Sequence, residues 1–336
     1  MADRIGIHEV AVAAGVSTTT VSHALNDRGK VSPGTRERVQ RVAQELGYRP
    51  NRIASALRNQ RTGVLGFVSD EIATTPFAGR IVLGAQEAAA ERGQTLMVVN
   101  SNGDPEVERR QIEALLAQQV DALLYATMFH RVVTAPAVAG RTPLVLVNAT
   151  DPTAAVPSVV PDEHAAGRSA TRVLLEAGHR RIVHLTLTDE REAVDRRIGG
   201  HLAAMADAGL APRVVRVPGP GNAEAGRRAM EQALREEPDL TAAFVFNDPM
   251  AMGVYQVAYG RGLRIPDALS VISVDNLEIV AAELQPGLTT LELPHAAMGR
   301  WAVEEAGRLL GGAEQPVEHA RMEAPLVRRG SVSTRV

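Results

Sequence analysis

The stretch VAVAAGVSTTTVSHALND, residues 10–27, carries five hydroxyl side chains, three of them consecutive threonines, inside a pattern that otherwise predicts helix. Threonine is a mediocre helix former because its branched Cβ restricts χ1. Gly15 stands where a first short helix would end in a left-handed turn, and Ser17 can cap a second. This spacing predicts a helix-turn-helix, and its buried apolar stripe is Val10, Ala11, Ala14, Val16, Val21 and Leu25.

A third helix is predicted directly downstream. Ser32 is a suitable N-cap, Pro33 suits the first turn, and Gly47 suits the end of the helix. The inward-facing positions are expected to be Val39, Val42 and Leu46.

DNA binding explains the threonines. In a helix-turn-helix, the N-terminal end of the second helix enters the major groove, where hydroxyl groups bond base edges or phosphates and threonine methyls contact thymine methyls. The alternative is that these side chains only cap and solubilise the helix. We interpret residues 1–48 as a DNA-binding domain, and its candidate DNA contacts are Ser17, Thr18, Thr19, Thr20, His23 and Asn26.

Length and composition describe a globular protein of more than one unit. The chain has 336 residues, 45% of them hydrophobic and 22% charged, and no apolar run is long enough for a membrane helix. Its start, MADRIGIHEV, lacks the apolar core of a signal peptide, so we expect a cytoplasmic protein without membrane contact. The absence of cysteine excludes disulfides, a thiol nucleophile and cysteine-ligated zinc.

Charge is distributed unevenly along the chain. Residues 1–61 hold ten Lys and Arg against five Asp and Glu, whereas residues 62–336 hold 26 against 34. A short basic unit on a larger acidic body is expected when one end meets a polyanion, although basic runs are also often solvated helix faces.

Three stretches resemble the LacI/GalR family of bacterial transcription repressors: IHEVAVAAGVSTTTVSHALND, VSPGTRERVQRVAQELGYRPN and IASALRNQRTGVLGFV. The likeness continues to the C-terminus. It implies that Thr18, Thr19 and His23 read bases. The family usually has Arg at the last of these positions, so His23 is a departure that affects whichever operator base an Arg would read.

Residues 49–61 form a separate linker segment in this interpretation. Pro50 blocks continuation of the third helix, and Asn51 can cap a short new one. The resemblance implies a hinge helix ordered on DNA, in which Asn51 and Ala54 contact DNA and paired Leu57 side chains wedge into the minor groove. The alternative is that Leu57 packs against the body of the protein.

From residue 62 onward, apolar strand-like runs alternate with amphipathic helices. The runs VLGFVS, TLMVVNS, DALLYAT and PLVLVN form one series, and RIVHLTL, VVRVP, AAFVFND and LSVISVDN form a second. Near-continuous apolar strands between helices predict parallel sheets covered on both faces. The fold class is therefore α/β, with two doubly wound parallel-sheet subdomains, and the resemblance implies that these are periplasmic-binding-protein-like. The resemblance places them at about 62–160 with 291–321 and at about 161–290 with 322–330.

Ligands of open parallel sheets bind beyond the carboxyl ends of the strands. Hydrogen-bonding side chains there, together with the positions of the family's effector arginine and aromatic, give these candidates for effector binding: Asp70, Phe77, Ser101, Phe129, Asn148, Asp162, Arg197, Asn247 and Asp275. This set suits a polyol such as a sugar. Asp162 has an alternative role as a helix cap, and capping is the role we expect for Asp248.

Enzyme signatures are absent from the sequence. It has no GxGxxG after the first strand, no GxxxxGK[ST] loop and no GxSxG elbow, and its acid-base cluster Asp162-Glu163-His164 lacks a second ligand set for a metal. We expect no catalytic residue, no metal and no cofactor.

We therefore interpret the chain as a regulator that binds a palindromic double-stranded operator as a homodimer under the control of a small sugar-like effector. A dimer is expected because no leucine heptads follow Leu326-Val327. The alternative is a solute-binding module whose DNA role is vestigial or architectural.

Overall fold

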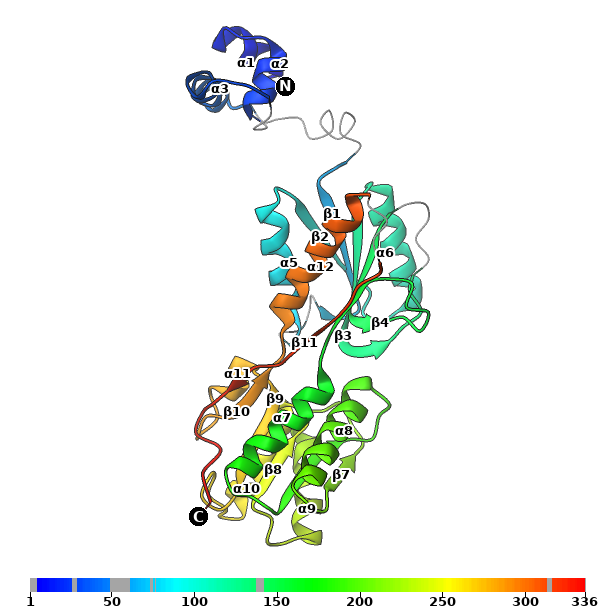
Figure 1. Cartoon of the computed structure of the whole chain (residues 1–336), viewed down its shortest axis with the longest axis vertical. Coiled ribbons are helices and arrows are strands. Elements are labelled where there is room, and N and C mark those ends of the chain that lie inside the picture. Colours follow the sequence, from blue (N-terminus) through cyan, green and yellow to red (C-terminus); the bar gives the residue numbers. More distant parts are fainter. Residues whose placement is uncertain are drawn as a thin grey trace. The chain divides into compact units, whose positions relative to one another are not determined.

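The computed structural model describes residues 5–25, 29–48, 61–72, 75, 77–136, 142–312 and 316–335 (Figure 1). The chain divides into two compact units, residues 1–62 and 63–336. Four predicted DNA contacts, Asn26, Asn51, Ala54 and Leu57, lie outside the described residues.

The described residues of the first unit form three helices, α1 (Ile7–Ala14), α2 (Thr18–Leu25) and α3 (Pro33–Glu45). Gly15 ends α1 in the left-handed conformation at φ 63°. As predicted for N-caps, the Oγ atoms of Ser17 and Ser32 accept hydrogen bonds from the backbone N–H of the third residue beyond each serine. Val10, Val21 and Val39 are fully buried where the helices meet. The predicted helix-turn-helix is confirmed.

The prediction that Leu46 belongs to the core of this unit is wrong. Leu46 is 36% exposed, and Ala43 takes the buried position on the last turn of α3. The helix ends at Glu45, so Leu46 lies outside the helical repeat that was expected to direct its side chain into the core.

The second unit consists of two lobes, each built on a six-stranded sheet. Lobe one has the strand order β11-β5-β4-β3-β1-β2, and all its neighbouring strands are parallel. Its strands are β1 (Val64–Ser69), β2 (Thr95–Asn100), β3 (Ala122–Val132), β4 (Leu144–Thr150), β5 (Ser158–Pro161) and β11 (His319–Met322). Helices α5 (Gly79–Glu91) and α12 (His295–Leu310) pack on one face and α6 (Pro105–Ala117) on the other.

Lobe two repeats this arrangement with the order β12-β10-β9-β8-β6-β7, parallel except between β10 and β12. Its strands are β6 (Ile182–Leu187), β7 (Arg213–Val217), β8 (Ala242–Val245), β9 (Ser270–Asp275), β10 (Thr289–Glu292) and β12 (Leu326–Val327). Its helices are α7 (Glu163–Glu176), α8 (Glu192–Asp207), α9 (Ala223–Glu236), α10 (Asp248–Gly260) and the short α11 (Glu278–Ala281). The predicted α/β class with two doubly wound sheets is confirmed.

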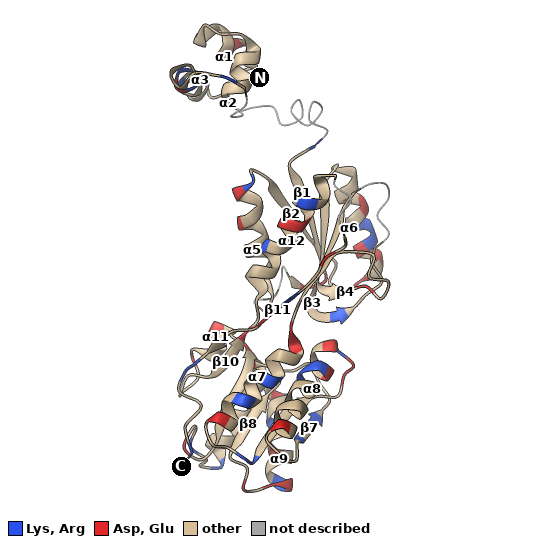
Figure 2. Ribbon diagram, in the orientation of Figure 1, with Lys and Arg blue, Asp and Glu red and all other residues tan. Residues whose placement is uncertain are grey.

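The chain crosses between the lobes three times, after β5, after β10 and after β11. The crossings are joined by backbone hydrogen bonds, such as Asp162 N to Met322 O at 2.8 Å and Glu292 N to Pro325 O at 2.8 Å. Many of the charged residues lie on the helices that cover the sheets (Figure 2). Among the described residues, no helix has the length and apolar character that crossing a membrane requires.

Three helix pairs in this unit approach each other closely at glycines. The pairs are α5 with α12, α7 with α8, and α9 with α10, and they cross at Gly84 and Gly299, Gly167 and Gly200, and Gly226 and Gly253. A Cβ atom added at any of these six glycines would lie 1.9–2.2 Å from a backbone oxygen of the partner helix. The absence of a side chain therefore sets the distance between the paired helices.

Candidate functional site: an exposed helix end and a cleft between two lobes

The N-terminal end of α2 is exposed, as a DNA-reading helix requires. Ser17, Thr18, Thr19 and His23 are exposed and Thr20 is half-buried, whereas Val21 points into the core. Ser17 Oγ accepts from Thr20 N at 3.1 Å and lies 2.9 Å from Thr20 Oγ1. The capping alternative thus applies to Ser17 and Thr20, whose hydroxyls bond each other.

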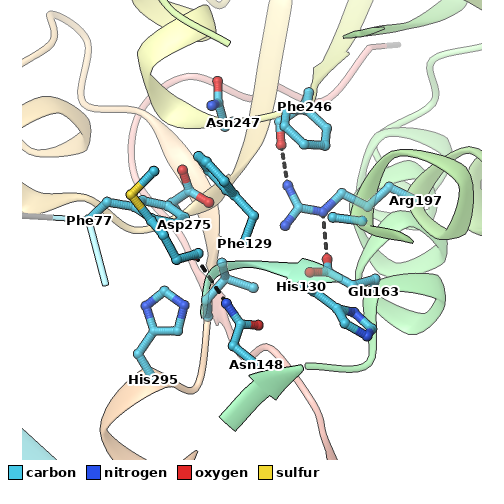
Figure 3. A pocket seen from close by; sticks show the side chains of 13 residues that line it. Phe77, Phe129, His130, Asn148, Glu163, Arg197, Phe246, Asn247, Asp275 and His295 are labelled. Carbon is cyan, nitrogen blue, oxygen red and sulfur yellow. Dashed lines mark hydrogen bonds and ion pairs between the residues drawn. The ribbon is translucent and has the colours of Figure 1, made fainter. Parts of the chain in front are cut away.

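The second candidate site is a cleft between the two lobes, with about 310 Å³ of space between protein atoms when the adjoining open solvent is included. It lies at the carboxyl ends of β3, β4, β8 and β9, the edge at which open parallel sheets bind ligands. Lobe one and lobe two both supply lining residues, and the structure brings together six of the nine predicted effector contacts: Phe77, Phe129, Asn148, Arg197, Asn247 and Asp275 (Figure 3).

Arg197, from the second turn of α8, is held in place by lobe two. Its Nε donates to Glu163 Oε2 at 2.6 Å, and its Nη1 donates to the Phe246 carbonyl at 2.6 Å (Figure 3). The guanidinium carbon also lies 4.7 Å from the Phe246 ring centroid. The Arg197 and Glu163 side chains are 3% and 2% exposed, so this ion pair is fully buried.

Asp275 is the least satisfied polar group in the cleft. It ends β9 at φ 132°, and both of its carboxylate oxygens are buried without a hydrogen-bond partner. Burial raises the pKa of Asp275 well above its ordinary range; the Asp248 carboxylate raises it further, while Arg197 opposes the shift. A buried acceptor without a partner is costly, so this position favours a ligand that donates hydrogen bonds.

Three more lining residues also have buried atoms without a hydrogen-bond partner. These atoms are Asn148 Oδ1, His130 Nδ1 and His295 Nε2. Asn148, at φ 57°, donates through Nδ2 to the carbonyls of Thr127 and Met128 at 3.0 and 3.1 Å, which turns Oδ1 away from them. Burial lowers the pKa of His130, and it lowers the pKa of His295 to about 4, so both imidazoles are neutral at pH 7.

Aromatic rings form the apolar wall of the cleft. Phe77 and Phe129 lie 5.7 Å apart between centroids, and His295 meets Phe77 edge-on at 5.4 Å. Arg191, just before α8 in lobe two, places its guanidinium 4.4 Å from the Phe129 ring centroid in lobe one. The cleft thus combines apolar ring faces with buried donors and acceptors.

Three predicted effector contacts do not line the cleft. Asp162 caps α7 by accepting from Ala165 N at 2.9 Å, which is the alternative role considered for it. Asp70 accepts from Met128 N at 2.9 Å and pairs with Arg131 at 3.1 Å, so it positions the strand that carries Phe129. Ser101 is buried, and it follows β2 in lobe one at the edge of the sheet.

The expected capping role of Asp248 is also wrong. Asn247 caps α10, accepting from Met250 N at 2.9 Å. Asp248 is fully buried one residue later and accepts from Ser273 Oγ, from Thr290 Oγ1 at 2.8 Å and from Leu277 N at 2.7 Å. Burial raises the pKa of Asp248 to about 6, against the effect of these donors. Asp248 therefore ties α10 to β9, β10 and the start of α11.

Sequence reasoning missed several lining residues. The polar ones are Glu163, His130 and His295, and the apolar ones are Met128, Ala193, Phe246 and Leu293. Glu163 had a detectable signal, because it directly follows Asp162 after a strand. His295 had none, since it begins α12 directly after a crossing between the lobes.

A groove adjoins the cleft and shares Phe77, Asp275, Leu293 and His295 with it. Its other lining residues are Arg80, Asn276, Leu277, Glu278, Ile279 and Glu292. Arg80 of lobe one pairs with Glu292 of lobe two at 3.0 Å, and Glu292 accepts from Asn276 Nδ2 at 3.2 Å. No group of three or more His, Asp or Glu side chains suited to a metal ion occurs in the described parts of the chain.

Comparison with known proteins identifies both units. Residues 6–51 match the family model of bacterial regulatory proteins of the lacI family, and residues 62–313 match that of periplasmic binding proteins and the sugar binding domain of the LacI family. The HTH-type transcriptional regulator GalS of Salmonella typhimurium is 35% identical over 98% of this chain and 97% of its own.

Two further relatives cover almost the whole chain. The HTH-type transcriptional regulator DegA of Bacillus subtilis is 32% identical over 97% of this chain and 98% of its own. A solved complex of the transcriptional regulator CelR with cellobiose is 28% identical, with a TM-score of 0.66, and covers 98% of this chain and 100% of its own.

Proposed function

The chain belongs to the LacI family of bacterial regulatory proteins, and we propose that it is a repressor of carbohydrate-utilisation genes, controlled by a sugar-like ligand bound between its lobes. The lining of the cleft is the observation that supports a sugar-like ligand. It collects unpartnered buried oxygens of Asp275 and Asn148 and unpartnered nitrogens of His130 and His295 beside aromatic rings. Hydroxyl groups both donate and accept, and the C–H face of a sugar packs on rings, so a polyol satisfies all of these groups.

Each cleft residue has a distinct role in this proposal. Asp275 accepts from ligand hydroxyls, and Arg197 donates to a ligand oxygen from the position fixed by Glu163 and the Phe246 carbonyl. Asn148 accepts through Oδ1, and Asn247 lies at the lobe-two wall while it caps α10. Phe77 and Phe129 cover the apolar face of the ligand.

DNA is bound through the exposed end of α2. Thr18, Thr19 and His23 contact base edges in the major groove, while Ser17 and Thr20 preserve the start of the helix. The active form is a homodimer, because a palindromic operator presents two equivalent half-sites to a twofold-symmetric protein. The protein acts in the cytoplasm and has no enzymatic activity.

Ligand control follows from differential affinity. A ligand that bridges the lobes favours one arrangement of them, and operator affinity changes by the ratio of its affinities for the two states. By linkage, operator DNA changes the ligand affinity by the same factor.

Two measurements test this function. In vitro selection from random duplexes should yield a palindromic site, and gel-shift titration should give a dissociation constant at least about 1000-fold below that for unrelated DNA at the same salt concentration. Salt-sensitive binding without sequence preference would refute the operator claim. A thermal-shift screen should then find sugars that raise the melting temperature and alter operator affinity. A sugar that fills the cleft without changing operator affinity would refute the switching claim.

A further inference from the structure

Both arginines that line the cleft and the adjoining groove are already paired with glutamates. Arg197 is bonded to Glu163 inside the cleft, and Arg80 is bonded to Glu292 in the groove. The remaining charged lining residues are Asp275 and Glu278, both acidic. The lining therefore carries two arginines against four carboxyl groups, and neither arginine is without a carboxylate partner.

Helix N-termini are the other common anion sites in proteins. Four described helices, α7, α8, α10 and α12, begin beside the cleft. The first three each have an acidic residue in the first turn, namely Glu163, Glu192 and Asp248, whereas α12 has none and starts with the buried His295. Arg191, next to Phe129, is paired with Asp189. The two lining histidines are buried and neutral, so they do not supply a cation either.

An anionic ligand would therefore have to share an arginine with a carboxylate. A phosphate at Arg197 would bring a second negative group to a guanidinium that already donates to Glu163 Oε2 at 2.6 Å. The alternative position places the phosphate near Asp275, a buried carboxyl group that offers it no positive charge. Like charges about 6 Å apart at an effective dielectric constant near 20 weaken binding by roughly 100-fold.

We infer that the cleft takes an uncharged polyhydroxy ligand and rejects the phosphorylated form of the same sugar. This inference rests on the proposed function and narrows its ligand class. Asn148 fits it, because its amide accepts from a hydroxyl without adding a further negative charge to the wall.

Matched sugar pairs test the inference on the full-length protein. Thermal shift and isothermal titration calorimetry would compare glucose with glucose 6-phosphate, galactose with galactose 1-phosphate, ribose with ribose 5-phosphate, and fructose with fructose 1-phosphate. In every pair that binds, the uncharged sugar should bind at least about 100-fold more tightly. Equal or tighter binding of a phosphorylated partner overturns the inference while the proposed function stands. If no member of any pair binds, both fail.

Two variants test the cause. Glu163→Gln removes the competing charge at Arg197 and should reduce the discrimination against phosphate to less than about 10-fold. Glu176→Gln, an exposed glutamate on the same helix paired with Arg172, is the matched control and should leave the discrimination unchanged. Circular dichroism checks folding, and Glu292→Gln, which frees Arg80 in the adjoining groove, provides an independent test if Glu163→Gln does not fold. Discrimination that persists in the folded variants overturns the inference.

Discussion

Replacing Gly167 with alanine tests whether close helix contact positions the ligand-binding arginine. Gly167 lies where α7 crosses α8, and a Cβ atom there would be 2.2 Å from the Arg197 carbonyl oxygen, 2.8 Å from its Cα and 2.9 Å from its carbonyl carbon. All three atoms belong to backbone, so no side-chain rotation relieves the overlap. The helices must move apart by about 1 Å to restore ordinary van der Waals distances.

The stability cost follows from this separation. Forcing an extra methyl into a packed interface costs about 1–3 kcal/mol, and a gap of about 1 Å along the rest of the contact loses up to half of its dispersion energy. Alanine recovers up to about 1 kcal/mol of helix propensity. We therefore expect Gly167→Ala to lower the free energy of unfolding by about 2 kcal/mol.

Urea denaturation followed by circular dichroism measures this change, with the midpoint as the readout. Gly307→Ala on α12 is the matched control. The nearest atom to its added Cβ is Arg92 Nε at 3.9 Å, so the variant should be as stable as the wild type or more stable by up to about 1 kcal/mol. Affinity for a sugar identified in the screen should fall only in Gly167→Ala, since Arg197 moves with α8. Wild-type stability and affinity in Gly167→Ala would refute the reasoning.

Three further predictions concern single residues. His201 is fully buried, and burial lowers its pKa to about 4, so the unfolded chain takes up the proton first as the pH falls below 6.5. Wild-type stability should therefore drop by about 1 kcal/mol relative to His201→Gln between pH 7.5 and 5.5, measured by denaturant titration, and parallel pH profiles would contradict this. Asp275→Asn should raise the free energy of unfolding by roughly 1–3 kcal/mol at pH 8, because an unsatisfied carboxylate is removed. This gain should shrink as the pH falls, because burial raises the pKa of Asp275 in the folded state, so that the folded wild type takes up the proton before the unfolded chain does. Sugar affinity measured by calorimetry should decrease. His23→Arg should change the preferred base at one symmetric position of the selected operator, and an unaltered selected sequence would show that His23 does not read DNA.

Much of the fold could be predicted from the sequence because its long strands are continuous apolar runs between helices. The shortest strands could not be predicted in this way. β11, with the sequence HARM, has half-buried or exposed side chains and no apolar run, and β12 is two residues long. Their strand conformation depends on pairing with partners far away in the sequence, β5 and β10. Local patterns carry no such information.

The site was less predictable than the fold, because pairing between side chains depends on helix packing. Arg197 was expected in the cleft, but its partner Glu163 is 34 positions earlier on another helix. Their contact requires α7 and α8 to cross at Gly167 and Gly200. Acidic residues after strands were equally ambiguous, since Asp275 lines the cleft, Asp162 caps a helix and Asp248 joins elements of lobe two.

The strand order also determines how long β5 lacks one of its partner strands while the chain is being synthesised. β5 forms early in synthesis, but its outer partner begins at His319, 161 positions after Ser158. At translation speeds of about 5–20 residues per second, β5 waits roughly 10–30 s with one edge unpaired. Such edges recruit strands of other nascent chains. Pro161 has no N–H to donate, which makes this edge a poorer template for aggregation until the last part of the chain arrives.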